Sequence, residues 1–594
     1  MYNVFVKNSP TQPNENKKLK ILLLGTCGAE AFIDTQGLYE LELNAQHLLY
    51  DGLTPIKLPS AQENYDAVIV VLTERYIVDC AGNKGNEFLL HRDGIQRETI
   101  LQNAKDDISR QFNDLTDNFT TTQILFLSFS EPSVNLNGLL SHRYSLTNPK
   151  HFVHLLNEYL STICDTKPNT YFLDINLIAA SLGALFINDQ LLNSTFHGNY
   201  LSNWDYANDN NRIVKQSPMS DLVNFEDRVL YFKHTFWCTV IDAITIIRSP
   251  LPIKAIIIDL DDTLWRGVAA DDALTPTDRV EGWPLGFAEA LLYYKNRGGL
   301  LAIASKNDRT IAHQKLVEIY GDKITINDFA STRIGWERKS DYVAEILQEL
   351  NLLPDNVAFI DDNPREVNDV KERFPGIHTL GFEPYLWRAQ IIFGTKFQVA
   401  KVSNEAKERT QLLHASISRR NLAKSMPREE WLKSLELAVH IRVILSHNDI
   451  DFSRALELLN KTNQFNTTGR RWDFKQLQDL FESGGRIYTV RAKDKLADNG
   501  IISVAIVYRA NIEQMVLSCR VFGLGIEDAL LSNIESDILA QSDEVCAKLI
   551  DTGRNFTCHG TFKDRGYVQR TADSWFRSNC GEPPEWITLT VDLI

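Results

Sequence analysis

The sequence predicts a multidomain α/β protein whose first two domains are built around parallel sheets. Short runs of apolar residues recur along the first part of the chain at 20–25, 67–72, 123–128 and 170–175, and the intervening stretches are long enough for helices. Runs of this kind are typical of strands that are buried on both faces of a parallel sheet. A chain of 594 residues is also too long for one hydrophobic core, which favours about three domains.

The composition is that of a soluble globular protein, with 44% hydrophobic and 23% charged residues. A formal net charge of −15 argues against general binding to nucleic acid or to an anionic membrane, because both require a basic surface. The N-terminal segment lacks the apolar core of a signal peptide, and no later stretch approaches the length of a membrane span. The eight cysteines show no paired C-x-x-C spacing, so we expect reduced thiols, no zinc site and a cytoplasmic location.

Changes in composition divide the chain into five segments. A polar leader at 1–18, expected to be disordered, precedes a first α/β domain at 19–245. A second α/β domain is predicted at 250–396, and the amphipathic, charge-rich segment 397–433 is expected to form linking helices. The last domain is predicted at 434–594. The central domain carries the most specific catalytic pattern of the three.

An apolar run in the predicted central domain ends on two carboxylates. The stretch 256–265 reads IIIDLDDTLW, so Asp259 follows directly on three isoleucines and Asp261 lies two residues further on. If the isoleucines form a buried strand of a parallel sheet, both aspartates lie in the turn at its carboxyl end. Open α/β sheets bind their ligands at that edge. A lone aspartate in this position is more often a helix cap, so the prediction of a site depends on further residues.

Three later stretches contain further residues that are expected to lie at the same site. The run LLAIASKND contains Ser305, Lys339 begins a segment with helical periodicity, and NVAFIDDNP contains the pair Asp361 and Asp362. The order and spacing of nucleophile, hydroxyl, lysine and acidic pair resemble the four motifs of the haloacid dehalogenase superfamily. The resemblance implies a Rossmann-like core, and the spacing leaves no room for a large inserted cap domain. A site that binds a ligand without catalysis stays an alternative.

The chemistry explains why these residue types occur together. A carboxylate such as Asp259 can attack phosphorus and form an aspartyl-phosphate if Mg²⁺ neutralises the charge between the two anions. Asp261 is expected to protonate the leaving oxygen and later to deprotonate water. The hard oxygen ligands that Mg²⁺ prefers are expected from Asp259, Asp361 and Asp362, and from the backbone carbonyl of Asp261. The hydroxyl and the lysine of the later stretches are expected to hold the phosphoryl oxygens.

The first apolar run ends in a turn that resembles a different enzyme family. Gly25-Thr26-Cys27 is similar to the first block of SGNH-type hydrolases, with cysteine where those enzymes have the serine nucleophile. The resemblance suggests Asp174 and His197 as partners. Threonine replaces the aspartate of the block, however, and Asp174 lacks a histidine three residues on. Cys27 is therefore either a thiol that carries an acyl group or a small residue that packs the turn.

The last predicted domain contains a pattern typical of phosphate binding. Strand-like runs at 486–490, 501–508 and 514–518 lead into RVFGLG, after which a helical pattern begins. A strand, R-x-x-G-x-G and a helix resemble the pyrophosphate cradle of GNAT acyltransferases, in which backbone N–H groups at a helix start bind phosphate and glycines permit close approach. A solvated loop is the alternative for the arginine pair that precedes these strands. The residues expected to bind the phosphopantetheine arm of a carrier protein are Arg470, Arg471, Arg520, Gly523 and Gly525.

Six motifs occur in the order that is expected of FkbH-like proteins. They are DLDDTLW, ASKND, GWERK, FIDDNPRE, KTNQFNTTGRRW and LSCRVFGLGIE, and the resemblance covers residues 251 to about 567. It implies an enzyme of the haloacid dehalogenase group that serves polyketide-type biosynthesis. Such an enzyme takes D-1,3-bisphosphoglycerate, removes both phosphates and loads a glyceryl group as a thioester on an acyl carrier protein.

The resemblance assigns to Asp259, Asp261, Ser305 and the later motif residues the same roles as the chemistry does. It adds Cys519, in the stretch SCRV, as a rival to Cys27 for the thiol that carries the acyl group. The sequence departs from the family in two places, and at the first of them Asp262 and Arg266 change the charge beside the site. The usual DNTLWGG appears here as DDTLWRG, and VAADDALT replaces the expected VIGEDG. These motifs therefore leave the identity of the acyl unit undetermined.

A thiolate can displace an acyl phosphate without ATP, so the expected reaction forms a thioester on the enzyme and then on the carrier. Hydrolysis of the remaining phosphate monoester is harder, and it is the step that needs Asp259 and Mg²⁺. Two other functions fit the same sequence. One is a plain phosphatase that acts on a small phosphoester or a phosphoprotein. The other is a scaffold that only binds carrier proteins.

Overall fold

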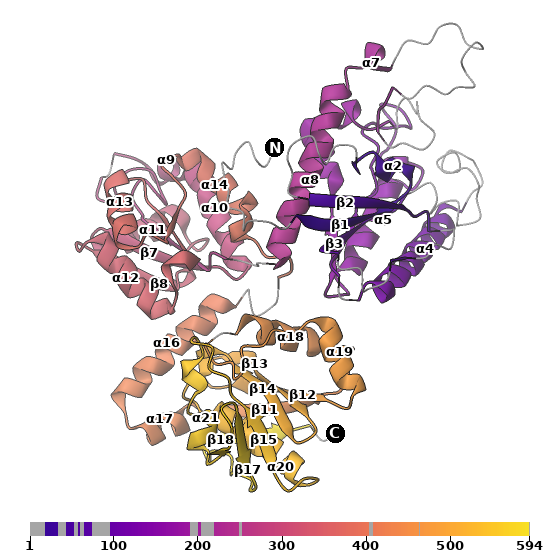
Figure 1. Ribbon diagram of the computed structural model, residues 1–594. Helices are drawn as coiled ribbons and strands as arrows, with labels where there is room; N and C mark the ends of the chain where they lie inside the picture. Colours follow the sequence, from indigo (N-terminus) through magenta and orange to yellow (C-terminus); the bar gives the residue numbers. More distant parts are fainter. Residues whose placement is uncertain are drawn as a thin grey trace. The chain divides into compact units, whose positions relative to one another are not determined.

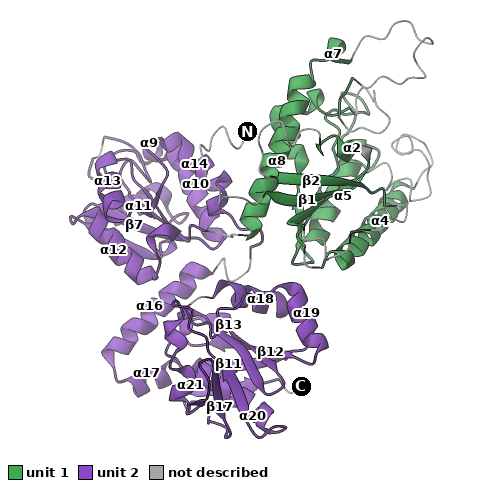
Figure 2. Ribbon diagram, in the orientation of Figure 1, with its two compact units in different colours: residues 1–248 green, residues 249–594 purple. Residues whose placement is uncertain are grey.

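The residues that the structure describes form three sheets, divided between two compact units. Residues 1–248 form the first unit and residues 249–594 form the second (Figure 2). One sheet lies in the first unit and two lie in the second. In the described part no helix is long and apolar enough to cross a membrane. The computed structural model describes residues 18–33, 43–52, 58–59, 65–73, 96–120, 122–189, 200–203, 219–248, 252–271, 273–402, 408–462 and 464–592, so the predicted leader lies outside it except for Lys18.

The first unit is built on a parallel sheet with the strand order β2-β1-β3-β4-β5. Four of these strands coincide with the apolar runs of the sequence. The exception is β2, whose sequence LNAQHLL alternates buried with exposed residues at its start instead of being apolar throughout. The bounds are β1 (Leu19–Gly25), β2 (Leu43–Leu49), β3 (Ala67–Val71), β4 (Ile124–Leu127) and β5 (Thr170–Leu173).

Helices cover both faces of this sheet. On β1, Leu22 and Leu24 pack into a core with α4 and α5, whereas Ile21 and Leu23 pack on the opposite face with α6 and α8. They alternate because successive side chains of a strand point to opposite faces. Figure 1 shows α8 on one side of the sheet and α4 on the other. The helices are α2 (Cys27–Glu30), α4 (Arg97–Asn118), α5 (Pro149–Cys164), α6 (Ile175–Leu182), α7 (Met219–Leu222) and α8 (Glu226–Arg248).

The second sheet is also parallel, in the order β10-β9-β6-β7-β8, and it begins the second unit. The strand predicted from the three isoleucines is β6, the central strand. Its last residue, Ile258, lies opposite Ile303 of β7 and Ile360 of β9. The carboxyl ends of these three strands therefore meet at one edge. The bounds are β6 (Ala255–Ile258), β7 (Leu300–Lys306), β8 (Ser331–Gly335), β9 (Val357–Ile360) and β10 (His378–Thr379).

Helices cover both faces of the second sheet as well. On β6, Ile256 and Ile258 pack with α10, α11 and α14, and Ala255 and Ile257 pack with α12 and α13. Among the residues that the structure describes, the connections after β6 and β7 contain only short helices and no inserted domain, as predicted. The helices are α9 (Pro276–Val280), α10 (Trp283–Asn296), α11 (Arg309–Tyr320), α12 (Lys339–Leu350), α13 (Pro364–Arg373) and α14 (Pro384–Phe393).

The third sheet is mixed and has eight strands in the order β16-β17-β15-β14-β13-β12-β11-β18. Its strands are β11 (Leu437–Ile444), β12 (Arg486–Lys493), β13 (Asp498–Tyr508), β14 (Asn511–Leu517), β15 (Val545–Lys548), β16 (Val568–Gln569), β17 (Ser574–Arg577) and β18 (Ile587–Val591). The helix α20 packs on one face of this sheet, and α18 and α19 pack on the other. The helices are α18 (Phe452–Lys461), α19 (Phe474–Glu482), α20 (Ile526–Leu539) and α21 (Thr561–Asp564).

Two parallel strands of the third sheet separate, and another segment fills the gap. β14 pairs with β15 only at Asn511 and Ile512. Further along, the Thr467 N–H donates to the carbonyl of Met515 on β14 at 3.0 Å, and the Ile550 N–H, just beyond β15, donates to the Thr467 carbonyl at 2.7 Å. The backbone at residue 467 therefore bridges the two diverging chains.

The segment predicted as linking helices contains α16 (Arg409–Ser425) and α17 (Arg428–Ser434). The Arg419 guanidinium, from α16, lies 2.7 Å from the carboxylate of Asp494, and both side chains are almost fully buried. It also donates to Asn499 Oδ1 at 3.1 Å. This ion pair joins α16 to the β12–β13 turn of the third sheet.

Candidate active site

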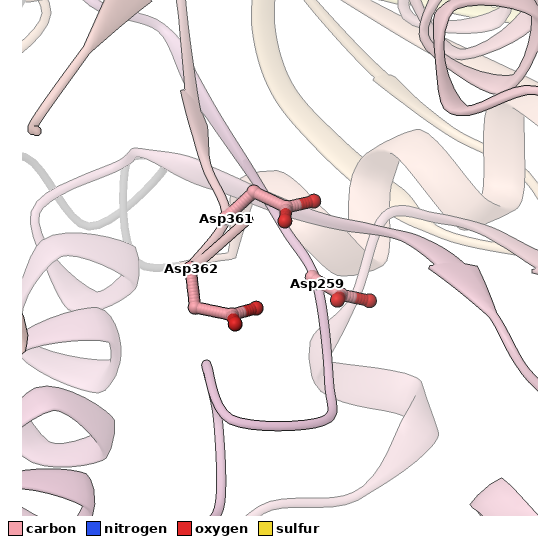
Figure 3. Close-up of side chains that lie close together, drawn as sticks. All are labelled: Asp259, Asp361 and Asp362. Carbon is pink, nitrogen blue, oxygen red and sulfur yellow. The ribbon is translucent and has the colours of Figure 1, made fainter. Parts of the chain in front are cut away.

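Three carboxylates meet at the carboxyl edge of the second sheet. Asp259 follows β6, and Asp361 and Asp362 follow the neighbouring strand β9. One oxygen from each side chain lies within 4.8 Å of the others (Figure 3). Asp259 and Asp361 are 6% and 1% exposed, respectively, whereas Asp362 is exposed. The parallel register brings together residues that are about a hundred positions apart in the chain.

Lys339 joins two of these carboxylates. It is the first residue of α12, and its Nζ lies 2.7 Å from Asp259 Oδ2 and 2.6 Å from Asp361 Oδ2. Burial alone would lower the pKa of Lys339, but the charges of Asp259 and Asp361 raise it above its ordinary value. The lysine is therefore a fixed cation. When all three carboxylates are ionised, one ammonium leaves two negative charges uncompensated, which suits a divalent cation.

Two buried oxygens at this edge have no hydrogen-bond partner among the described residues: Asp259 Oδ1 and Ser305 Oγ. Leaving a buried polar atom unpaired costs about 1–3 kcal/mol, so such atoms point to a ligand. A carboxylate oxygen needs a cation or a donor, and a hydroxyl can donate to a phosphoryl oxygen. The three carboxylates also supply the hard oxygen ligands that Mg²⁺ prefers. The donor set therefore fits Mg²⁺ and a phosphoryl group together.

Asp261 lies in the same turn but its side chain has other partners. Trp265 Nε1 and the Ala269 N–H each donate to Asp261 Oδ1 at 2.9 Å, and Asn307 Nδ2 donates to Oδ2 at 3.0 Å. Burial raises the pKa of Asp261 to about 6. A carboxyl group with such a pKa can give and take a proton near neutral pH. The predicted metal contact of Asp261 concerns its backbone carbonyl, and it stays a prediction.

Three residues that hold the site were not predicted from the sequence. Besides Trp265 and Asn307, the Thr263 hydroxyl accepts a hydrogen bond from the Asp362 N–H at 3.2 Å and so joins the two strand exits. Asn307 could have been identified from the sequence. It lies two residues after Ser305, and side chains two positions apart at the end of a strand point to the same side. The bonds of Trp265 and Thr263 depend on how the turn folds.

Magnesium affinity is expected to rise with pH because the cluster holds protons. Burial, and next the charge of Asp259, raises the pKa of Asp361 to about 7, and burial raises that of Asp362 as well. These groups return to their ordinary values on unfolding. Between about pH 4 and about pH 7 these two groups therefore bind more protons in the folded protein without metal than in the unfolded chain, and their contribution to stability falls as the pH rises.

Metal binding requires the deprotonated carboxylates. The Kd for Mg²⁺ is thus expected to fall by up to about tenfold per pH unit from about pH 5 to about pH 7, and then to level off. Calorimetric titration with MgCl₂ across this range measures it. In Asp361→Asn the dependence should become shallower. An affinity that is independent of pH in the unchanged protein would contradict the proton-holding cluster.

The turn after β1 is closely packed. A Cβ at Gly25 would lie 2.7 Å from the Cβ of Ala29 and 2.9 Å from that of Val71, so only glycine fits there. Cys27 begins α2, but its side chain lies outside the described part, as does His197. Asp174 caps α6, and its Oδ1 accepts a hydrogen bond from the Ser128 hydroxyl at 2.9 Å. The catalytic role of Cys27 stays a prediction.

The predicted carrier-arm residues each have local contacts in the last domain. The Arg470 guanidinium lies 3.5 Å from the ring centroid of Trp472. Arg471 Nη1 donates to two backbone carbonyls near the end of α18, at 2.9 and 3.0 Å. Arg520 Nε donates to Ser518 Oγ at 3.2 Å. Arg471 thus has a role in fixing its own loop that the sequence did not indicate, and phosphate binding by the three arginines stays a prediction.

The glycine turn before α20 has the expected backbone but an unexpected environment. Gly523 and Gly525 have φ values of +78° and +82°, and Gly525 caps the helix. A Cβ at Gly525 would lie 3.1 Å from Trp586. The first turn of α20 also carries Glu527 and Asp528. Burial raises the pKa of Glu527 to about 7, so an anion here would meet a carboxyl group that is partly neutral near pH 7.

Cys519, the other candidate thiol, lies in the turn Cys519–Val521 that follows β14 and is exposed. It interacts electrostatically with Lys254 and Arg409, two cations from other parts of the same unit. The thiol is therefore accessible.

Comparison with known proteins gives matches among solved structures. No family model and no curated protein matches the chain. Among solved structures, the N-terminal part of a Bacteroides fragilis protein, which contains a phosphatase domain complexed with Mg, is 21% identical. The match covers 65% of this chain and 95% of that one, with a TM-score of 0.43. The Pnkp1/Rnl/Hen1 RNA repair complex is 11% identical over 62% of this chain and 97% of that one, with a TM-score of 0.17. Both TM-scores are too low to establish a shared overall fold, so the fold and the site stand on the geometry of this chain.

Proposed function

We propose that the second sheet carries a Mg²⁺-dependent phosphatase or phosphotransferase of the haloacid dehalogenase type. The observation that carries the proposal is the unpaired, buried Asp259 Oδ1 at the point where two further carboxylates and Lys339 converge. Asp259, Asp361 and Asp362 would hold the ion, which when bound offsets the negative charge between the nucleophile and the phosphoryl group.

The residues of the chain then divide the reaction between them. Asp259 attacks phosphorus, the bond from phosphorus to the leaving oxygen breaks, and Asp261 gives its proton to that oxygen. Asp261 next takes a proton from the water that attacks the aspartyl-phosphate, which releases phosphate and restores Asp259. Ser305 and Lys339 donate to the phosphoryl oxygens, where fixed donors act on the redistributing charge.

The finer proposal is that the enzyme loads an acyl unit, of the glyceryl type, on an acyl carrier protein. Its basis is the resemblance of the six motifs to FkbH-like proteins together with an exposed thiol, Cys519, that interacts electrostatically with Lys254 and Arg409. The thiolate attacks the acyl carbon of D-1,3-bisphosphoglycerate, and the bond from carbon to the phosphate oxygen breaks. The thiol of the carrier then attacks the thioester and releases the enzyme thiolate. We place this reaction in the cytoplasm, where thiols stay reduced.

One experiment tests both levels of the proposal. The protein is incubated with D-1,3-bisphosphoglycerate, MgCl₂ and a holo acyl carrier protein, and phosphate release and the intact mass of both proteins are recorded. The finer proposal expects a glyceryl adduct on the carrier, and an enzyme adduct that maps to Cys519 or Cys27. Phosphate release at one rate with and without carrier, with no adduct on either, indicates a plain phosphatase. Absence of release in every condition favours a binding scaffold.

A further inference from the structure

The loop between β4 and α5 presents apolar side chains almost completely to solvent. Leu139 and Leu140 are 95% and 97% exposed, and Tyr144 is 64% exposed. Single exposed leucines are common on protein surfaces, but adjacent apolar residues that are this exposed are typical of binding sites. We call Leu139, Leu140, Arg143 and Tyr144 the leucine loop. It belongs to the first unit, far in sequence from the carboxylate cluster (Figure 2).

The leucine loop stands on a rigid hydrogen-bonded base. Asn135 Nδ2 donates to the Ser141 carbonyl at 2.9 Å, and the Ser141 hydroxyl donates to the Asn137 carbonyl at 2.6 Å. Asn137 Nδ2 donates to the Thr147 carbonyl at 2.9 Å, and the fully buried Asn148 donates to Asn135 Oδ1 at 2.7 Å. Because these bonds fix the loop before any partner arrives, little conformational entropy is lost when the leucines are buried.

The charge around the leucine loop differs from that of the rest of the chain. The whole sequence has 77 acidic residues among 594, yet the 26 residues from 132 to 157 contain none. They contain Arg143, Lys150 and three histidines. Among the described residues both cations contact neutral groups: Arg143 stacks on Tyr144, 4.8 Å from the ring centroid, and Lys150 donates to the Pro132 carbonyl at 3.1 Å. This stretch of the chain is therefore basic and apolar on an acidic protein, and Glu131, which directly precedes it, is paired with His154 at 2.9 Å.

We propose that the leucine loop is the docking surface for the carrier protein: a small acidic helical partner that takes the two leucines into an apolar groove rimmed by carboxylates. The inference rests on the proposed function, because that function requires such a partner. Two lysine or arginine residues are too few to hold an anionic membrane, which takes a cluster of about four to eight. A second copy of this chain, with a net charge of −15, repels the first at long range.

The test measures binding of a fluorescently labelled, acidic holo acyl carrier protein to the full chain. In the double variant Leu139→Ser/Leu140→Ser the Kd is expected to rise by at least about tenfold, because buried apolar anchors dominate such interfaces. Arg143→Glu should weaken binding most at low salt, where screening is least. Leu222→Ser is the matched control: Leu222 is 69% exposed in the same unit, outside the leucine loop, and its replacement should leave the Kd within about twofold.

Other outcomes overturn the inference. Equal affinity of the double variant and the unchanged protein for the carrier would do so, as would lack of binding by the unchanged protein. Binding to phosphatidylserine vesicles that the double variant loses would assign the loop to a membrane, and self-association that it loses in sedimentation would assign it to a second copy. Carrier-independent phosphate release is measured in parallel. Its loss in Asp259→Asn shows that the phosphatase proposal holds even if the leucine loop does not bind the carrier.

Discussion

Replacing Asp259 by Asn is expected to slow phosphate release by about 10⁴-fold or more, because an amide cannot attack phosphorus and the covalent step is lost. The substitution keeps the size of the side chain and an oxygen that accepts from Lys339, so the fold should persist. Phosphate release from an acyl phosphate and from a small phosphoester, each with saturating MgCl₂, measures the effect. Retention of more than about a tenth of the activity would exclude Asp259 as the nucleophile.

The matched control is Asp262→Asn, three positions further on. Asp262 is exposed and has φ of +53°, a left-handed conformation that asparagine tolerates well. Its Oδ1 accepts a hydrogen bond from the Gly267 N–H at 2.6 Å, which the amide oxygen can replace. The same change of charge in the same turn should therefore alter the rate by less than about threefold. A large effect in both variants would point to local charge and not to a nucleophile.

Replacing Lys339 by Met is expected to destabilise the protein without metal by about 3–5 kcal/mol, because Asp259 and Asp361 would then be buried without their shared cation. The rate should fall by about 10²-fold or more, since a donor to the phosphoryl group is removed. Part of the lost stability should return with MgCl₂, which supplies positive charge to the same carboxylates. Denaturant unfolding with and without MgCl₂, together with kcat, measures these effects.

Lys306→Met provides the comparison for Lys339. Lys306 also pairs with a carboxylate, Glu366, at 2.6 Å, but its side chain is 37% exposed. An ion pair that water screens contributes about 1 kcal/mol or less, so this variant should unfold close to the unchanged protein. If both lysine variants lose the same small amount of stability, burial does not make the Lys339 pairs stronger than the Lys306 pair. The interpretation of Lys339 as a fixed cation would then be wrong.

The sequence alone predicted the α/β fold and the edge at which the carboxylates lie. The reason is physical: a buried parallel strand must be apolar on both faces, so runs such as III before Asp259 and VAFI before Asp361 are visible without coordinates. β2 was not predicted because the exposed polar residues Asn44 and Gln46 interrupt its apolar pattern. The partners of Asp261 were not predicted either, since the Trp265 bond depends on how the turn folds and Asn307 reaches that carboxylate from the neighbouring strand.

The sequence by itself determined which residues lie at the ends of the central strands, because each strand is visible as a local apolar run and the residues that follow it can be read directly. Only the tertiary structure decided which of them meet. The strand order puts Asp361 beside Asp259, and the start of α12 brings Lys339 to both. It also brought Trp586 to the glycine turn of α20 and exposed two adjacent leucines on a rigid loop. Such contacts depend on packing between distant segments, which no local pattern records.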